Sequence, residues 1–248
     1  MAIFRYDGKQ VVITGAIGEG HAPSTFTIAV DDPALFAALA LKDALVRRGV
    51  RVDGDAVARH RDVTESFAAS TADPLASRTS PSLIELLRVT DKVSQNLHAE
   101  LMLRFASPDG TREAGLESMR DFLKSLGAGQ DDYRIDDGSG LSRNDLVTPS
   151  LVARLLTHMY GSEHREQWIS LLPVGGEDGT LSNRLCCTSD GTRVHAKTGT
   201  LARSVALSGY ADSRSHGMLA FSILVNDFSA PSATVRQWVD KMALALTE

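Results

Sequence analysis

Residues 194–201 read Val-His-Ala-Lys-Thr-Gly-Thr-Leu, and this stretch decides the fold predicted for the 248-residue chain. It overlaps the first of three predicted strands, which lie at 193–198, 204–211 and 218–225. Polar turn residues separate the last two strands. An amphipathic helix is predicted to follow at 232–246. We therefore expect three strands followed by a helix at this end of the chain.

The tripeptide Lys197–Gly199 is a weak signal by itself, because it also fits an exposed strand residue followed by a turn. An enzyme that transfers the acyl group of a peptide with a free carboxylate needs a fixed cation, a hydroxyl and a backbone N–H directed at the developing oxyanion. Lys197, Thr198 and the amide of Thr200 would supply these groups. Gly199 leaves room for a substrate backbone that lies along the strand.

A second motif, Ser94-Gln95-Asn96, lies between helices predicted at 80–93 and 98–105. Serine and asparagine favour helix ends and turns, so the pair alone is ordinarily structural. At a helix junction, a hydroxyl and a carboxamide can also project into a cleft as a proton relay and as a clamp on an acyl amide. The presence of Lys-Thr-Gly in the same chain favours this second interpretation.

Penicillin-recognising serine enzymes combine such motifs with a Ser-x-x-Lys whose serine is the nucleophile. This chain has six lysines, and none is preceded by serine three residues earlier. Two interpretations stay open: the chain is the carboxy-terminal part of a longer enzyme, or it is a natural relative that lacks the covalent chemistry.

The chain resembles the D-alanyl-D-alanine carboxypeptidase/endopeptidase family, the class C low-molecular-mass penicillin-binding proteins. The stretches that carry this resemblance are 30–50, 80–103, 137–143, 176–181 and 195–201. The resemblance implies a multidomain α+β protein with a penicillin-binding protein/β-lactamase-like transpeptidase domain, in which helices flank an antiparallel sheet. Residues 1–75 would be the end of an inserted domain. Residues 76–248 would be a transpeptidase domain without its amino-terminal part.

The resemblance also implies a role for each motif residue. Ser94 would pass a proton to the leaving amine, and Asn96 would hold the substrate. Lys197 and Thr198 would bind the terminal carboxylate of the substrate. For Ser139, in the Gly-rich segment 137–143, a structural loop and a cleft wall are both open interpretations. The predicted catalytic residues are Ser94, Asn96 and Lys197, and the predicted substrate-binding residues are Thr198, Gly199, Thr200 and Ser139.

The implied activity is that of a penicillin-sensitive serine-type D-Ala-D-Ala carboxypeptidase or endopeptidase, which acts on peptidoglycan stem peptides through an acyl-enzyme. We expect the chain alone to be inactive for lack of the nucleophile. The alternative is a non-catalytic protein that binds D-Ala-D-Ala peptides. An unrelated α/β hydrolase is disfavoured, because the sequence contains no Gly-x-Ser-x-Gly elbow.

Composition excludes other classes of protein. The net charge of −5 provides no positive field for a phosphate backbone, so we expect no nucleic-acid partner. No apolar stretch approaches the roughly 20 residues of a membrane span. No metal-binding or phosphate-loop motif occurs, and we expect no metal and no cofactor. The first residues lack a signal-peptide pattern. We expect the full-length protein to be periplasmic or otherwise extracytoplasmic, with its signal upstream.

Outside the motifs, the sequence predicts strands within 10–30 and at 50–57, and helices at 33–49, 112–126 and 149–160. Residues 68–82 are rich in Ala, Ser, Thr, Asp and Pro, which is typical of a connection between domains. We therefore predict a domain boundary near residue 75.

Overall fold

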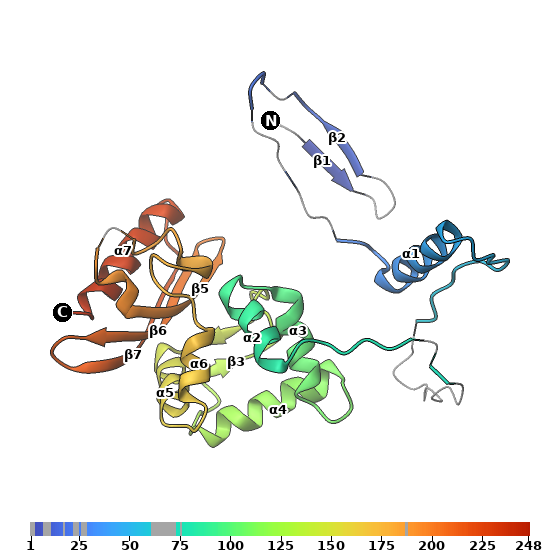
Figure 1. Cartoon of the computed structure of the whole chain (residues 1–248). Coiled ribbons are helices and arrows are strands. Elements are labelled where there is room, and N and C mark those ends of the chain that lie inside the picture. The colour runs from blue at the N-terminus through green and yellow to red at the C-terminus, as the bar shows by residue number, and fades with distance from the viewer. Residues whose placement is uncertain are drawn as a thin grey trace. The chain divides into compact units, whose positions relative to one another are not determined.

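The structure is a computed structural model that describes residues 3–6, 11–16, 18–21, 25, 29–60, 73–74, 76–186 and 188–248. The chain divides into two compact units, Met1–Ala76 and Ser77–Glu248, which can be followed by colour in Figure 1. Among the described helices, none has both the length and the apolar character that a membrane span requires.

The first unit contains an antiparallel hairpin and one helix. Strand β1 (Ile3–Tyr6) pairs with β2 (Val11–Thr14), and α1 (Pro33–Arg47) follows. The helix begins where the sequence predicts, because the Asp32 side chain accepts a hydrogen bond from the amide of Leu35 at 3.0 Å. Pro33 occupies the first turn, where its missing N–H removes no intrahelical bond.

Two further strands are predicted in this unit, at 50–57 and at 26–30; the structure describes the first fully and the second only at its last two residues. Residues 50–57 form no strand, so that prediction is wrong. The carbonyl of Gly54 accepts a hydrogen bond at 2.6 Å from the Lys42 side chain on α1, and Arg51 pairs with Asp53 within the segment. Side-chain hydrogen bonds hold this segment, and among the described residues no strand pairs with it. Of the strand predicted at 26–30, residues 26–28 lie outside the described residues, and residues 29 and 30 are not in a strand.

The second unit begins with helices. Its elements before the main sheet are α2 (Leu83–Lys92), α3 (Asn96–Phe105), α4 (Arg112–Ser125), β3 (Tyr133–Arg134), β4 (Leu146–Val147), α5 (Pro149–Tyr160), α6 (Arg165–Leu171) and the short 3-10 helices η1 (Gly179–Leu181) and η2 (Gly191–Arg193). The side chains of Thr111 and Thr148 cap α4 and α5. The helices predicted at 112–126 and 149–160 are therefore confirmed, whereas α6 was not predicted.

The three predicted carboxy-terminal strands form one antiparallel sheet in the order β5-β6-β7, with β5 (Val194–Leu201), β6 (Ser204–Ser213) and β7 (Gly217–Asn226). Helix α7 (Ser232–Ala245) packs on one face of this sheet, and α5 with α6 packs on the other (Figure 1). The predicted α+β class, with an antiparallel sheet flanked by helices, is confirmed.

Alternation along β6 explains how the sheet is held between helices. Val205 and Leu207 point to the α7 face, where they meet Val235 and Val239, and all four are almost fully buried. Burial of each such side chain contributes roughly 1.5–3 kcal/mol. Tyr210 points to the opposite face, among residues of α5 and α6. These two packed faces fix the sheet, and with it the position of β5.

Candidate active site

The junction between α2 and α3 places Ser94 in an uncommon backbone conformation. Its φ is +58°, in the left-handed region that few residues with a side chain adopt. The amide of Gln95 bonds back to the carbonyl of Thr90 at 3.0 Å, and the Gln95 side chain caps α3 through the amide of Leu97 at 3.1 Å. Both ends of the junction are thereby fixed. Strain of this kind is often found where a side chain must be presented for function.

Lys197 extends from β5 to this junction. Its Nζ donates a hydrogen bond to Ser94 Oγ at 2.8 Å and another to the carbonyl of Thr198 at 3.0 Å. Because Ser94 Oγ accepts from the ammonium, its own O–H hydrogen is free to point elsewhere. The structure thus brings two motifs that lie 103 residues apart into direct contact.

Burial and a nearby carboxyl act on Lys197 in opposite directions. Burial lowers the pKa of Lys197, and the charge of Asp91 partly offsets this effect. Burial likewise raises the pKa of Asp91, against the charge of Lys197. Asp91 lies in the last turn of α2, three residues before Ser94. The charge of Asp91 therefore favours the charged form of Lys197, which burial disfavours.

The outer edge of β5 is free in one half of the strand and covered in the other. The amide of Ala196 donates to the carbonyl of Pro173 at 2.9 Å, and the carbonyl of Val194 accepts from the amide of Gly175 at 3.0 Å. Backbone groups alternate in direction along a strand, so those of Thr198 and Thr200 point to the same outer edge. Among the described residues, no strand pairs with that edge. The Thr200 N–H therefore points to the outer edge of β5, where the sequence predicts a donor to the developing oxyanion.

The hydroxyl of Thr198 is hydrogen-bonded to a residue that was not among the predicted site residues. Thr198 Oγ1 lies 2.9 Å from Oγ1 of Thr180 in η1. The 3-10 helix is locked to the end of α2, because Lys92 Nζ pairs with Asp178 at 2.6 Å. Gly179 packs so tightly on the carbonyl of Lys92 that a Cβ there would clash with it. Thr180 is thus a fixed partner of Thr198.

A groove of about 1050 Å³ runs between β5 on one side and the α2–α3 junction with the loop 134–147 on the other. The seven predicted site residues all line this groove: Ser94, Asn96, Ser139, Lys197, Thr198, Gly199 and Thr200. For Ser139, the structure therefore favours the cleft-wall interpretation. Three arginines, Arg134, Arg143 and Arg203, also line the groove.

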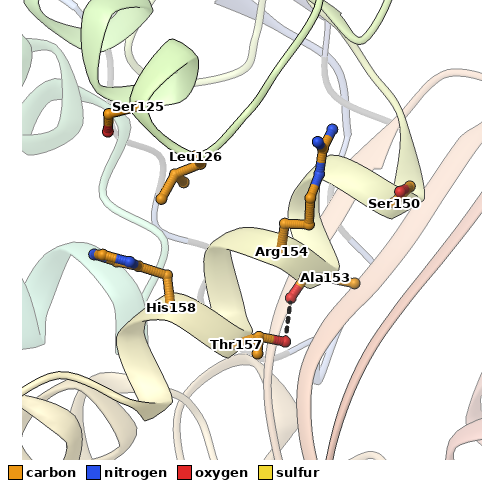
Figure 2. A pocket seen from close by; sticks show the side chains of 7 residues that line it. All are labelled: Ser125, Leu126, Ser150, Ala153, Arg154, Thr157 and His158. Atoms are coloured by element: carbon orange, nitrogen blue, oxygen red, sulfur yellow. Dashed lines mark hydrogen bonds between the residues drawn. The ribbon is translucent and has the colours of Figure 1, made fainter.

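A second hollow, of about 510 Å³, lies at the end of α4 and along α5, lined by Ser125, Leu126, Ser150, Ala153, Arg154, Thr157 and His158 (Figure 2). Its polar groups serve the fold. Thr157 donates to the carbonyl of Ala153 at 2.8 Å, drawn as a dashed line in Figure 2. Arg154 pairs with Asp132 at 2.7 Å and donates to the carbonyl of Gly127 at the same distance. The groove at β5 is therefore the candidate active site.

Sequence reasoning missed three residues that contribute to the groove from outside the motifs. Thr180 belongs to the stretch 176–181, which was matched without a role for this residue. Glu100 follows Asn96 by one helical turn. Asp91 precedes Ser94 by three residues. A lone carboxylate or threonine carries no distinguishing pattern, and only the folded arrangement shows what each one contacts.

Comparisons with known proteins agree with this geometry. The sequence model of the D-Ala-D-Ala carboxypeptidase 3 (S13) family matches residues 3–247. A D-alanyl-D-alanine carboxypeptidase of Actinomadura sp. (strain R39) is 36% identical over 249 residues, which cover 97% of this chain and 45% of that protein. Penicillin-sensitive carboxypeptidase A of Dictyostelium discoideum is 27% identical over 261 residues, which cover 99% of this chain and 48% of that protein.

A comparison of structures shows the same fold. Penicillin-binding protein 4 (dacB) of Haemophilus influenzae superposes with a TM-score of 0.82 at 22% sequence identity, over 100% of this chain and 56% of that one. The chain spans about half the length of the curated relatives that it matches. With a family match over nearly every residue, the chain belongs to the D-Ala-D-Ala carboxypeptidase 3 (S13) family.

Proposed function

We propose that the chain forms the carboxylate-binding and proton-transfer part of a serine-type D-Ala-D-Ala carboxypeptidase that acts on peptidoglycan stem peptides and is acylated by β-lactams. The observation that carries this proposal is the 2.8 Å contact between Lys197 Nζ and Ser94 Oγ beside the free edge of β5. The protein would work outside the cytoplasm, where peptidoglycan lies. Its first unit would be the end of an inserted domain.

In this proposal the substrate lies along the free edge of β5. Its terminal carboxylate pairs with the ammonium of Lys197 and accepts a hydrogen bond from the Thr198 hydroxyl. The carboxamide of Asn96 holds the acyl amide of the substrate. The Thr200 N–H points to the carbonyl oxygen, where negative charge develops in the transition state.

The chemical step needs a serine nucleophile, which we propose is supplied by a Ser-x-x-Lys in a longer form of the protein. Its oxygen attacks the carbonyl carbon, and the C–N bond to the terminal D-alanine breaks. The proton lost by the nucleophile reaches the leaving amine through Ser94, whose O–H is free because Lys197 donates to its oxygen. Water then cleaves the ester and restores the serine.

Labelling with a fluorescent penicillin tests this proposal on two proteins. We expect no covalent adduct on this chain alone, and a labelled band that survives denaturation for a longer form containing Ser-x-x-Lys. Ser94→Ala in the longer form should slow acylation by about two orders of magnitude or more, as the loss of a proton-transfer group does.

Two outcomes would contradict the proposal. A labelled band on this chain alone would mean that the nucleophile lies within it, at a hydroxyl such as Ser94 or Ser139. A longer form that binds D-Ala-D-Ala peptides reversibly but is never labelled would instead be the non-catalytic binding protein. Equilibrium binding measured on the same preparation separates these cases.

A further inference from the structure

On the basis of the proposed function, we infer that Glu100 of α3 is a positioning residue. It holds the loop with Ser139, which forms one wall of the groove, at a fixed distance from Asn96. Glu100 itself does not line the groove. It would act on the substrate through the loop that it binds.

The contact rests on one carboxylate oxygen and two consecutive amides. Glu100 Oε1 accepts hydrogen bonds from the N–H of Gly138 at 3.1 Å and from the N–H of Ser139 at 2.9 Å. Hydrogen bonds to an ionised carboxylate are stronger than those between neutral groups. Since Asn96 lies four residues earlier, the two side chains project from the same face of α3. A single helix therefore places both the substrate clamp and the anchor of the wall.

The loop also packs directly on α3. A Cβ added to Gly138 would lie 2.9 Å from Cβ of Leu103 and 3.0 Å from the carbonyl oxygen of Ala99. Leu103 is buried, so its side chain has little freedom to move away. The loop can approach α3 this closely because residue 138 is glycine. Glu100 then fixes where along the helix the loop rests.

The internal shape of the loop does not depend on Glu100. Asp137 accepts hydrogen bonds from the amides of Gly140 at 2.5 Å and Ser142 at 2.7 Å. At the far end, Arg143 donates to the carbonyl of Ala202 in the β5–β6 turn at 3.1 Å. The loop is thus a preformed body with one anchor on α3 and the other on the hairpin. Loss of Glu100 should shift this body and widen the groove, while β5 and Ser94 stay in place.

The expected kinetic signature is a loss of substrate binding with little change in the chemical step. In the longer, active form, Glu100→Ala should raise KM for a D-Ala-D-Ala peptide by about tenfold and change kcat by less than about threefold, as expected when an interaction common to ground and transition states is lost. Glu100→Gln should restore most of the affinity, because its amide oxygen still accepts from both N–H groups. Glu100→Asp, one methylene shorter, should be intermediate and serves if the alanine variant fails to fold.

Glu85→Ala is the matched control, since Glu85 is an exposed glutamate on α2 whose ion pair is with the surface residue Arg88. Hydrogen exchange of the Gly138 and Ser139 amides gives a second measurement that needs no activity. We expect faster exchange in Glu100→Ala at these amides, and unchanged exchange in β5 and β6.

The two measurements separate this inference from the proposed function. If no form of the protein is acylated, the proposed function fails, and exchange at Gly138 and Ser139 still decides whether Glu100 anchors the wall. If Glu100→Ala matches Glu85→Ala in both KM and exchange, Glu100 is not a positioning residue. A fall in kcat at constant KM would also overturn the inference, because it would assign Glu100 to the chemical step.

Discussion

The two walls of the groove are built by different interactions. On one side, β5 is held by backbone hydrogen bonds to β6 and by a packed apolar core against α7. On the other side, the loop 137–142 is held by carboxylates that accept its amides, from Glu100, Asp137 and Asp145. The sheet wall therefore depends on backbone hydrogen bonds and burial, whereas the loop wall depends on three side-chain carboxylates. Substitution and pH should affect the two walls differently.

In the sheet wall, we expect the largest effect of a substitution at Gly199, because the substrate must lie close to the backbone of this residue. Gly199 lies within β5, pairs with Ala206 and lines the groove, and it has no positive φ that would require glycine. A Cβ there would lie 3.2 Å from Cβ of Ala206, so the neighbour must shift by a few tenths of an ångström. In the longer form, Gly199→Val should abolish acylation, because the new side chain occupies the place of the substrate.

The melting temperature of the same preparation decides between a substrate role and a fold role for Gly199. We expect a small decrease, since a β-branched residue suits a strand. Lys241→Ala, at an exposed lysine on α7 outside the groove, is the control and should keep activity. A large loss of stability, with full activity in the fraction that stays folded, would show that Gly199 serves the fold.

The second largest effect should come from the charge on the sheet wall. Lys197→Ala in the longer form removes the cation that pairs with the substrate carboxylate and the donor to Ser94 Oγ. We expect the second-order rate of acylation by a β-lactam to fall by about two to four orders of magnitude, as for other preorganised charge-stabilising groups. Lys241→Ala, at an exposed lysine on α7, is the matched control. An unchanged rate in a folded variant would remove Lys197 from the mechanism.

Substitution of Thr180, the hydrogen-bond partner of Thr198, should have a smaller effect on acylation. In the structure Thr198 donates its hydroxyl hydrogen to Thr180 Oγ1. When Thr198 turns this hydrogen to a substrate carboxylate, Thr180 can donate to Thr198 instead, because both hydroxyl hydrogens rotate. Thr180→Val removes that donor and should lower acylation efficiency by about tenfold, the equivalent of one hydrogen bond. Thr180→Ser should restore the rate. If valine and serine behave alike, the hydroxyl pair has no functional role.

The two walls also differ in how far the sequence predicts them. The strands of the sheet wall follow from alternation and polar turns, and the caps at Asp32 and Thr148 place two helices correctly. The strand expected at 50–57 shows the limit, because apolar residues alone do not supply a pairing partner. The left-handed backbone of Ser94 was also beyond prediction, since the pattern shows only that a helix is interrupted.

Long-range contacts account for what the sequence analysis missed. Glu100 reaches the amides of a loop 38 and 39 residues later, and Thr180 meets Thr198 across 18 residues. The motif residues could be selected because three short patterns occur together. Their supporting residues have no pattern of their own, and local propensity says nothing about which loop a carboxylate will bind.

The smallest predicted effect is a difference between the two walls in how their stability changes as the pH falls. Burial opposes ionisation of Asp137, but hydrogen bonds from the amides of Ser142 and Gly140 outweigh it and lower the pKa of Asp137. A carboxyl group with a lowered pKa contributes stability that is present above its unfolded pKa and is lost as the pH falls through its folded pKa. Burial raises the pKa of the neighbouring Asp145, which should therefore take up a proton first. Protonation of Asp145 favours the folded state, so the loop wall should loosen only at lower pH, where Asp137 takes up its proton.

The backbone N–H and C=O groups that pair β5 with β6 do not titrate, and burial lowers the pKa of His195 on β5. The sheet wall should therefore keep its protection until that imidazole takes up a proton, independently of Asp137 in the loop wall. Hydrogen exchange of this chain, expressed as protection relative to the unfolded rate at each pH, tests the difference. Protection of the Gly140 and Ser142 amides should decrease as Asp137 takes up its proton, and that of β6 should not follow this titration. In Asp137→Asn, which has one acceptor oxygen in place of two, these amides should already be less protected at neutral pH and nearly independent of acid. Loss of protection in both walls at the same pH would mean that the groove unfolds as one body, and that charge does not distinguish its two sides.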